Sequence, residues 1–150
     1  RYFDQMPVMV VGADTRSGRL IASRFLGRDR EVRVFVTDAA AAEELRAAGA
    51  KVALGDVSDD SHVAGACLNC FSVVLVGEAA RDDRQRSFAA APEAVMEGWA
   101  KAVNSAGVHR VIWVVDEDPP ATPIDEVAVV DPSTSDMAEA VFDLDAVRQI

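Results

Sequence analysis

Two glycines bound a short polar segment, Gly12-Ala13-Asp14-Thr15-Arg16-Ser17-Gly18, which follows a run of apolar residues. A glycine-bounded turn between a strand and a helix presents backbone N–H groups and the positive end of the helix dipole to anions such as phosphates. Arg16 adds a guanidinium at the helix start that could reach a phosphate or a ribose. The alternative is that Arg16 is an ordinary solvated loop arginine. This segment is therefore the first candidate for a phosphate-binding site.

Cys67 and Cys70 form a C-x-x-C sequence, a spacing found in redox and zinc sites. No second C-x-x-C is present, and the two histidines, His62 and His109, have no metal-ligand spacing. Asn69 suits a left-handed position at the end of a helix. We therefore expect both cysteines to pack in the core and no metal to bind, with redox activity as the alternative.

The remaining polar residues do not form a recognisable catalytic set. The carboxylate runs Asp59-Asp60 and Asp116-Glu117-Asp118 are interpreted as exposed surface rather than as acid–base pairs or cation sites. No Gly-x-Ser-x-Gly sequence is present to position a nucleophilic serine, so a hydrolase triad is not indicated.

The composition excludes several classes of protein. The chain has 150 residues, of which 50% are hydrophobic and 27% charged, as in a folded domain. Its formal net charge of -10 disfavours nucleic acid and anionic membrane surfaces as partners. No apolar run approaches the ~18 residues of a membrane span. We expect a soluble, intracellular, cytoplasmic protein, or one in an organelle such as a plastid after removal of a targeting segment.

Five apolar segments that are typical of buried strands alternate with four helical segments. This alternation predicts an α/β fold with a three-layer, doubly wound parallel sheet, because parallel neighbours need crossover connections. We expect the strand order 3-2-1-4-5. The strands are expected at residues 8–11, 32–36, 51–54, 71–76 and 110–115, and the helices before residue 27 and at 39–48, 59–68 and 87–106.

The segment 116–150 differs in character from the rest. Residues 116–123 are acidic and rich in proline, which predicts an exposed loop, and residues 127–130 predict a short sixth strand. Asp136 and Glu139 have the spacing of a capping box at the start of a last helix. The chain begins at Arg1 and ends at Ile150 within this helical pattern, which leaves open that it is a piece of a longer protein.

The glycine segment resembles the NmrA-like branch of the atypical short-chain dehydrogenase/reductase superfamily, whose first loop commonly reads G-A-T-G-R-T-G followed by a basic residue. Gly12, Ala13, Arg16, Gly18 and Arg19 match this pattern. Residues 32–34, 49–57 and 106–111 are similar to later strands of the family, so the resemblance covers roughly residues 6–116. It implies one Rossmann-like NAD(P)-binding domain over residues 1–150.

The resemblance also implies which residues bind the cofactor. Thr15 stands where the family has its middle glycine, and its Cβ is expected to hold the pyrophosphate away and weaken binding. At the end of the second strand, Thr37 and Asp38 replace an arginine that pairs with the 2′-phosphate of NADP, which favours NAD; Asp38 is alternatively a helix N-cap. The implied cofactor-binding residues are Gly12, Asp14, Thr15, Arg16, Ser17, Gly18, Thr37, Asp38, Asp56, Val57 and Gly77.

The usual catalytic residues of the superfamily are absent from this sequence. Its reaction uses a Tyr-x-x-x-Lys pair and a serine, whereas the only tyrosine here is Tyr2 and the serine positions match Val115 and Asp116. We therefore interpret the chain as a sensor or regulatory module with weak or lost NAD(P) binding, acting with a protein partner or a second copy of itself. The alternatives are a structural or protein-interaction domain without cofactor, and an oxidoreductase or isomerase whose substrate part lies outside this chain.

Overall fold

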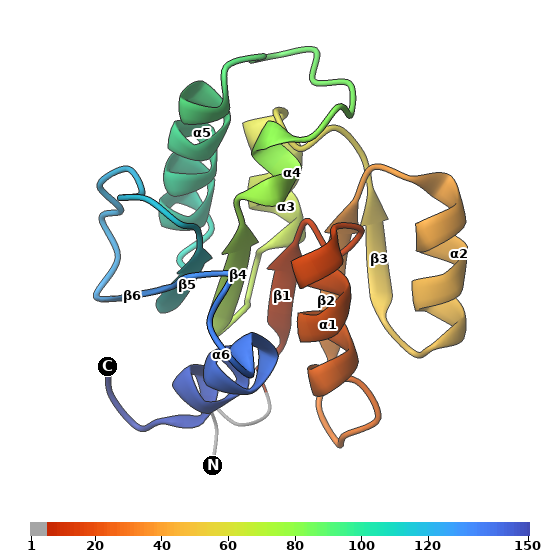
Figure 1. The fold of residues 1–150 in the computed structure, drawn as a ribbon, viewed down its shortest axis with the longest axis vertical. Coiled ribbons are helices and arrows are strands. Elements are labelled where there is room, and N and C mark those ends of the chain that lie inside the picture. Colours follow the sequence, from red (N-terminus) through yellow and green to blue (C-terminus); the bar gives the residue numbers. More distant parts are fainter. Residues whose placement is uncertain (1–5) are drawn as a thin grey trace.

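Six parallel strands form one sheet in the order β3-β2-β1-β4-β5-β6 in the computed structural model, which describes residues 6–150 (Figure 1). The predicted doubly wound fold, its strand order and the short sixth strand are confirmed. The order reverses between β1 and β4, so Val10 lies between Val34 of β2 and Val74 of β4. The strands are β1 (Val8–Val11), β2 (Val32–Val36), β3 (Lys51–Leu54), β4 (Ser72–Val76), β5 (Arg110–Val114) and β6 (Glu126–Val130).

Helices cover both faces of the sheet (Figure 1). One apolar cluster joins the sheet to α1, α2 and α6, and a second joins it to α3, α4 and α5. Alternate residues of β1 enter different clusters, Val8 and Val10 in one and Met9 and Val11 in the other, which explains the unbroken apolar run. The helices are α1 (Arg16–Phe25), α2 (Ala39–Ala47), α3 (Asp60–Ala66), α4 (Glu78–Arg81), α5 (Pro92–Ser105) and α6 (Met137–Ala146).

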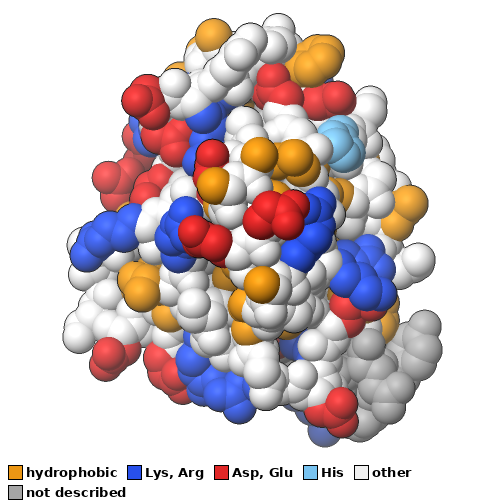
Figure 2. Space-filling model, turned by 90° about the vertical axis from the view of Figure 1, so that its right-hand side faces the viewer, with side chains coloured by type: hydrophobic (Ala, Val, Ile, Leu, Met, Phe, Trp, Pro, Cys, Tyr) orange, Lys and Arg blue, Asp and Glu red, His pale blue; other side chains and the backbone are white. Residues whose placement is uncertain are grey.

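The edge of the sheet at β3 is more polar than its centre. Every residue of β4 and β5 is buried, whereas Lys51 and Leu54 of β3 are exposed. Lys51 Nζ lies 3.0 Å from Glu31 Oε1, and a charged side chain at this position protects an edge strand from pairing with another chain. Figure 2 shows this side of the molecule, where basic and acidic side chains are interspersed.

The expected helix 87–106 begins later than its apolar pattern indicated. α5 begins at Pro92, a residue favoured at the first helical position, and residues 82–91 form an irregular loop. The short helix α4 between β4 and this loop was not predicted. The loop is held by contacts with the ends of distant strands, described below, which a local pattern does not reveal.

The predicted capping box of the last helix is wrong. Asp136 adopts a left-handed conformation with φ 54° and makes no side-chain cap, while Glu139 forms an ion pair with Arg24 of α1. A tertiary contact has thus taken the side chain that local spacing assigned to the cap. The helix also ends at Ala146, so Ile150 lies beyond it rather than within it.

The C-x-x-C cysteines lie in the core, as expected. Cys67 and Cys70 are 0% and 1% exposed, both belong to the cluster under α3 and α5, and Asn69 between them has the left-handed φ of 66°. Both thiols are free. Within residues 6–150, no group of three or more His, Cys, Asp or Glu side chains is arranged to hold a metal ion.

We expect both thiols of the folded protein to resist alkylation. Burial raises the pKa of Cys70 to about 11, and burial also raises the pKa of Cys67. At about pH 8 the reactive thiolate of Cys70 is then on the order of one part in a thousand. Iodoacetamide labelling followed by mass spectrometry checks this, with the urea-unfolded chain as the rapidly labelled control. Rapid labelling of the folded chain would instead support the redox interpretation.

No helix lies between β5 and β6, although parallel neighbours are usually joined by one. Residues 115–125 form a loop, in which Asp116, Glu117 and Asp118 are exposed, as expected. The loop is attached to β5 because Trp113 Nε1 donates a hydrogen bond of 2.9 Å to Thr122 Oγ1. The described residues between β5 and β6 therefore form no helix on which a Tyr-x-x-x-Lys pair would lie on one face.

Arg110 at the start of β5 is fully buried and holds the end of the chain. Its Nη2 lies 2.9 Å from Glu126 Oε1 of β6. Its Nη1 donates to three backbone carbonyls that follow or end α6, those of Leu144, Asp145 and Val147, at 2.9, 2.8 and 2.7 Å. This side chain thus joins β5, β6 and the end of α6.

Among residues 6–150, no helix has both the length and the hydropathy of a membrane span.

Candidate functional site

The predicted cofactor residues lie on loops that follow four neighbouring strands, at the carboxyl edge of the sheet. The loops after β1 and β4 meet where the strand order reverses, which is where open α/β sheets bind ligands. The residues that the sequence implied for cofactor binding therefore all lie at one edge of the sheet. Gly12, Asp14, Thr15, Arg16, Ser17 and Gly18 follow β1; Thr37 and Asp38 follow β2; Asp56 and Val57 follow β3; and Gly77 follows β4.

The two outer glycines of the turn are required by its geometry. Gly12 has φ +89°, a conformation that L side chains rarely adopt. A Cβ on Gly18 would lie 1.9 Å from the carbonyl oxygen of Gly12 and 2.8 Å from Cα of Ala13, so only glycine fits there. These glycines bring the first turn of α1 directly against the end of β1, the arrangement that holds a pyrophosphate in dinucleotide-binding folds.

Thr15 has a role that its position in the motif did not predict. It is the N-cap of α1, where its Oγ1 accepts a 2.9 Å hydrogen bond from the N–H of Gly18 and donates one of 2.7 Å to the carbonyl of Gly12. The residue is only 5% exposed, so its side chain is turned into the loop. Thr15 therefore occupies one backbone N–H of the helix start that a phosphate would otherwise use.

A carboxylate also lies beside the start of α1. Glu78 is the first residue of α4, and its Oε1 accepts a hydrogen bond from Oγ of Ser17 in the first turn of α1. The two loops approach closely here, because a Cβ on Gly12 would lie 2.8 Å from Cβ of Ala79. Gly77 is closely packed too, since a Cβ there would lie 2.7 Å from Val115 Cγ1. A carboxylate of the protein's own thus lies where the loops after β1 and β4 meet.

Asp14 places a second carboxylate at the end of β2. Its Oδ2 accepts hydrogen bonds from the backbone N–H groups of Thr37 and Asp38, at 2.8 and 3.1 Å. Its Oδ1 accepts a third from Nη1 of Arg84, at 2.9 Å. The Asp14 side chain is only 3% exposed. Three donors from two distant segments therefore converge on this one carboxylate.

Arg84 reaches this strand end from the loop 82–91. Its guanidinium also forms a two-point pair with Asp82, through Nε and Nη2 at 2.7 Å each, and its Nη1 lies 3.3 Å from Oγ1 of Thr37. Burial opposes its charge, but the hydrogen bonds that Arg84 donates to Asp82 and Asp14 outweigh that effect and raise the pKa of Arg84. The sequence interpretation found no arginine at the end of the second strand, and the structure brings one there from elsewhere.

Asp38 is the N-cap of α2. Its Oδ2 accepts a hydrogen bond of 2.9 Å from the N–H of Ala41, so the N-cap alternative considered for this residue is confirmed. The residue itself is exposed. The buried carboxylate at the end of β2 is therefore that of Asp14, supplied by the glycine turn, and not that of Asp38.

Two further predicted cofactor residues, Asp56 and Val57, follow β3, and the loop 82–91 reaches the first of them. Asp56 accepts hydrogen bonds from the N–H groups of Ser58 and Ser87, at 2.8 and 2.7 Å. Burial acts to raise the pKa of Asp56, but the bonds from Ser58 and Ser87 prevail and lower it. Val57 is fully buried, and its carbonyl accepts a 2.8 Å hydrogen bond from Trp99 Nε1. Val57 is thus closed to a ligand, while Asp56 is half-buried with its carboxylate engaged by the two serines.

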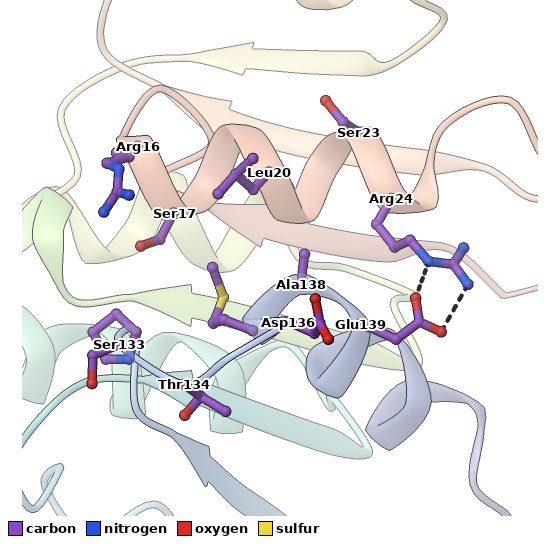
Figure 3. Close-up of a pocket in the computed structure, with 12 residues that line it drawn as sticks. Arg16, Ser17, Leu20, Ser23, Arg24, Ser133, Thr134, Asp136, Ala138 and Glu139 are labelled. Atoms are coloured by element: carbon purple, nitrogen blue, oxygen red, sulfur yellow. Dashed lines mark hydrogen bonds and ion pairs between the residues drawn. The ribbon is translucent and has the colours of Figure 1, made fainter.

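Arg16 is exposed and borders a groove of about 620 Å³ between α1 and the start of α6 (Figure 3). Leu20 of α1 is 53% exposed and lies along this groove. Ser133 and Thr134, in the loop after β6, face α1 from the other side (Figure 3). The groove adjoins the turn at Arg16 and Ser17 and is open to a ligand.

Two residues of the site, Glu78 and Arg84, were missed by the sequence interpretation. Glu78 directly follows Gly77 at the end of a predicted strand, so its place in the chain was a usable signal. Arg84 lies in an irregular loop, and its partner Asp14 is 70 residues away, so no spacing indicated the pair. Tyr2, the only tyrosine of the sequence, lies outside the described residues.

The family assignment agrees with this arrangement of strands, glycines and loops. The profile of the NAD(P)H-binding family matches residues 12–117, from the first glycine of the turn to the loop after β5. The chain belongs to this family. The resemblance to the atypical short-chain dehydrogenases/reductases is thereby confirmed, and the cofactor class of this NAD(P)H-binding domain is a nicotinamide dinucleotide. A comparison with curated proteins gives no match.

Solved structures with the same fold include several reductases. ChuY, an anaerobillin reductase from Escherichia coli O157:H7, is 24% identical with a TM-score of 0.58 over 95% of this chain and 62% of its own. A Citrobacter sp. triphenylmethane reductase complexed with NADP(H) is 16% identical, with a TM-score of 0.57 over 72% of this chain and 36% of its own. An NADPH-dependent quinone oxidoreductase from Escherichia coli is 17% identical, with a TM-score of 0.51 over 71% and 34%.

At these identities the likeness concerns the fold alone. The NAD(P)H-binding domain spans between 34% and 62% of the length of these three proteins.

Proposed function

We propose that this domain binds a nicotinamide dinucleotide weakly, with NAD preferred, and acts as a sensor or regulatory module rather than as a catalyst by itself. One observation carries the proposal. The glycine turn has the backbone geometry on which the family binds its cofactor, while two carboxylates of the protein hold donors beside it: Asp14 at the end of β2 and Glu78 at the start of α1. The domain thus has the backbone of a dinucleotide site, together with two carboxylates that compete with the phosphates of the cofactor for the same donors.

The frame fits the cofactor because the positions that must lack a side chain do lack one. Gly18 allows α1 to begin against β1, and Gly12 provides the positive φ of the turn. The backbone N–H groups of the first turn of α1 and the helix dipole would hold the pyrophosphate there. When bound, the dinucleotide supplies a hydride donor or acceptor.

Binding is expected to be weak because the dinucleotide must displace interactions of the free protein. Thr15 occupies the N–H of Gly18, and the loop 82–91 covers Asp56 through Ser87. Glu78 adds repulsion at the start of α1, where a diphosphate brings further negative charge. Each hydrogen bond of the free protein that must be broken makes dinucleotide binding less favourable.

The residues near the end of β5 support a role other than turnover. Val115, buried against Gly77, has no proton to donate, and the adjacent Asp116 is exposed. General acid–base catalysis needs a titratable group within hydrogen-bond reach of the reacting oxygen. As a sensor, the domain would pass its bound state to a protein partner or to a second copy of itself.

A second candidate is supported by the coverage of the structural neighbours. The chain spans 34% to 62% of the length of three reductases, so each of them has a further portion that this chain does not match. In this alternative the domain is the cofactor-binding part of an oxidoreductase or isomerase, and the substrate-binding part lies outside the sequence given.

Calorimetric titration of the full chain with NAD⁺, NADH, NADP⁺ and NADPH tests the proposal. We expect weak, saturable binding, and we expect Glu78→Gln to strengthen it about three- to tenfold, because glutamine keeps the bond to Ser17 and removes the charge at the helix start. Glu97→Gln, on the exposed face of α5, is the matched control and should change nothing.

The same titration separates the alternatives. Absence of saturable binding in the native chain and in Glu78→Gln would overturn the proposal in favour of a structural or interaction domain. Cofactor oxidation by the chain with added quinones or aldehydes would contradict the non-catalytic role and favour the reductase alternative.

A further inference from the structure

We propose that Asp14 determines which dinucleotide this domain selects, by occupying with its own carboxylate a site that would otherwise bind the 2′-phosphate of NADP. The inference rests on the proposed function and deepens it. It assigns specificity to a residue of the glycine turn, together with Arg84 from the loop 82–91. The test below distinguishes its failure from failure of dinucleotide binding.

The donors around Asp14 form a site suited to an anion. The N–H groups of Thr37 and Asp38 lie 2.8 and 3.1 Å from Oδ2, and Arg84 Nη1 lies 2.9 Å from Oδ1. Oγ1 of Thr37 lies 3.3 Å from the same Nη1. A guanidinium beside two backbone N–H groups is an arrangement that holds carboxylates and phosphates equally well, because both present several oxygens in fixed geometry.

The place of this site in the fold identifies its natural ligand. Thr37 and Asp38 directly follow β2, and β2 pairs with β1, whose end carries the glycine turn. In dinucleotide folds the adenosine ribose lies at the end of the second strand, where an acidic side chain accepts from its 2′-hydroxyl or an arginine pairs with its 2′-phosphate. This domain has both an acidic side chain, Asp14, and an arginine, Arg84, at that point, and the two form an ion pair.

The charge balance decides the specificity in the native chain. Arg84 is paired with Asp14 and Asp82, and Arg86 also pairs with Asp82, so the two carboxylates balance both guanidinium charges. A 2′-phosphate would find no unpaired positive charge here, would meet the carboxylate of Asp14 and would find its donors already used, which opposes binding. A ribose hydroxyl needs only an acceptor, and a carboxylate oxygen of Asp14 supplies one. The native cluster therefore favours NAD.

Removal of the Asp14 carboxylate reverses this balance. Arg84 would keep its two-point pair with Asp82, and its Nη1 would keep only the 3.3 Å contact with Oγ1 of Thr37, while the two N–H groups would lose their acceptor. Buried donors without an acceptor are unfavourable, so an incoming phosphate gains from satisfying all three. The variant is then expected to prefer NADP.

The experiment is calorimetry on the full chain and on Asp14→Ala, with two probes that differ only in the 2′-phosphate, adenosine 2′,5′-bisphosphate and adenosine 5′-monophosphate. We expect the ratio of their affinities to rise about tenfold or more in Asp14→Ala, in favour of the bisphosphate. NAD⁺ and NADP⁺ are titrated in parallel, and their preference is expected to reverse. Asp14→Ser serves as a second variant should the alanine variant fold poorly.

Two controls distinguish the effect of the Asp14 carboxylate occupying these donors from the effect of its negative charge alone. Asp38→Asn removes one negative charge from the same strand end and keeps the N-cap of α2, because asparagine caps as well as aspartate. The Asp14 carboxylate still accepts its hydrogen bonds in this variant, so the affinity for the bisphosphate relative to the monophosphate should rise little. Adding Arg84→Gln to Asp14→Ala should abolish most of the gain, since the guanidinium is the charged member of the site.

The outcomes bear separately on the two proposals. An unchanged ratio in both Asp14 variants, or an equal rise in Asp38→Asn, would overturn the inference. Native preference for NADP⁺ would overturn it as well. A gain for the bisphosphate in Asp14→Ala would support the anion site even if the native chain bound neither dinucleotide, a result that would count against the proposed function alone.

Discussion

Replacing Arg110 by methionine is expected to lower the free energy of unfolding by about 3–5 kcal/mol, the effect typical of breaking a buried charge pair. The guanidinium is fully buried and neutralises Glu126, itself 8% exposed. Burial acts to raise the pKa of Glu126, but bonds from the Ile150 N–H and from Arg110 outweigh it and keep that pKa low. The substitution would also leave the carbonyls of Leu144, Asp145 and Val147 without this donor.

Urea unfolding of the native chain and of the variant measures this loss. Arg46→Met is the matched control, because Arg46 pairs with Glu43 on the surface of α2 and surface pairs contribute at most about 1 kcal/mol. If Arg110→Met cost no more than this control, the buried pair would not hold the end of the chain as described.

Gly18→Ala is expected to destabilise the domain by about 3 kcal/mol, at the upper end of the range for overpacked sites. Alanine normally favours a helix over glycine, yet here its Cβ would lie 1.9 Å from the Gly12 carbonyl and 2.8 Å from Cα of Ala13. Both neighbours are backbone atoms, so α1 would have to move away from β1. We expect this displacement to weaken dinucleotide binding as well.

Gly98→Ala provides the opposite expectation within the same domain. Gly98 lies in α5, and a Cβ there would be 3.5 Å from the nearest atom, Cβ of Asp60, which is an ordinary contact. This variant should gain about 0.5–1 kcal/mol from the better helix propensity of alanine. Denaturant unfolding of both variants checks the pair. Equal stabilities would show that α1 does not depend on the close approach at Gly18.

Local pattern was sufficient for most of the fold. The strands are short and apolar because helices cover both faces, and glycine or an N-cap residue marks most helix starts and ends. Asp59, for example, caps α3, and Gly49 follows α2 with φ +103°. The errors lie where tertiary contacts override local preference, as at Glu139, which pairs with Arg24 instead of capping its own helix.

The site was predictable in position and not in detail. The alternation of strands and helices places the loops after β1, β2, β3 and β4 at one edge, so the candidate residues were found together. The state of each side chain depended on the loop 82–91, whose conformation follows from long-range bonds such as that between Arg84 and Asp14. No periodicity encodes such a bond, so the occupant of the anion site was invisible in the sequence.

The buried Arg110 also imposes an order on how the domain is completed as it is synthesised. Its partners are Glu126 and the carbonyls of Leu144, Asp145 and Val147, all of which leave the ribosome after β5 itself. Until they emerge, burying the guanidinium against β5 would enclose an unpaired charge, which is strongly unfavourable. We therefore expect β5 to take its buried place only after β6 and α6 have been synthesised, so that these two elements complete this part of the sheet together.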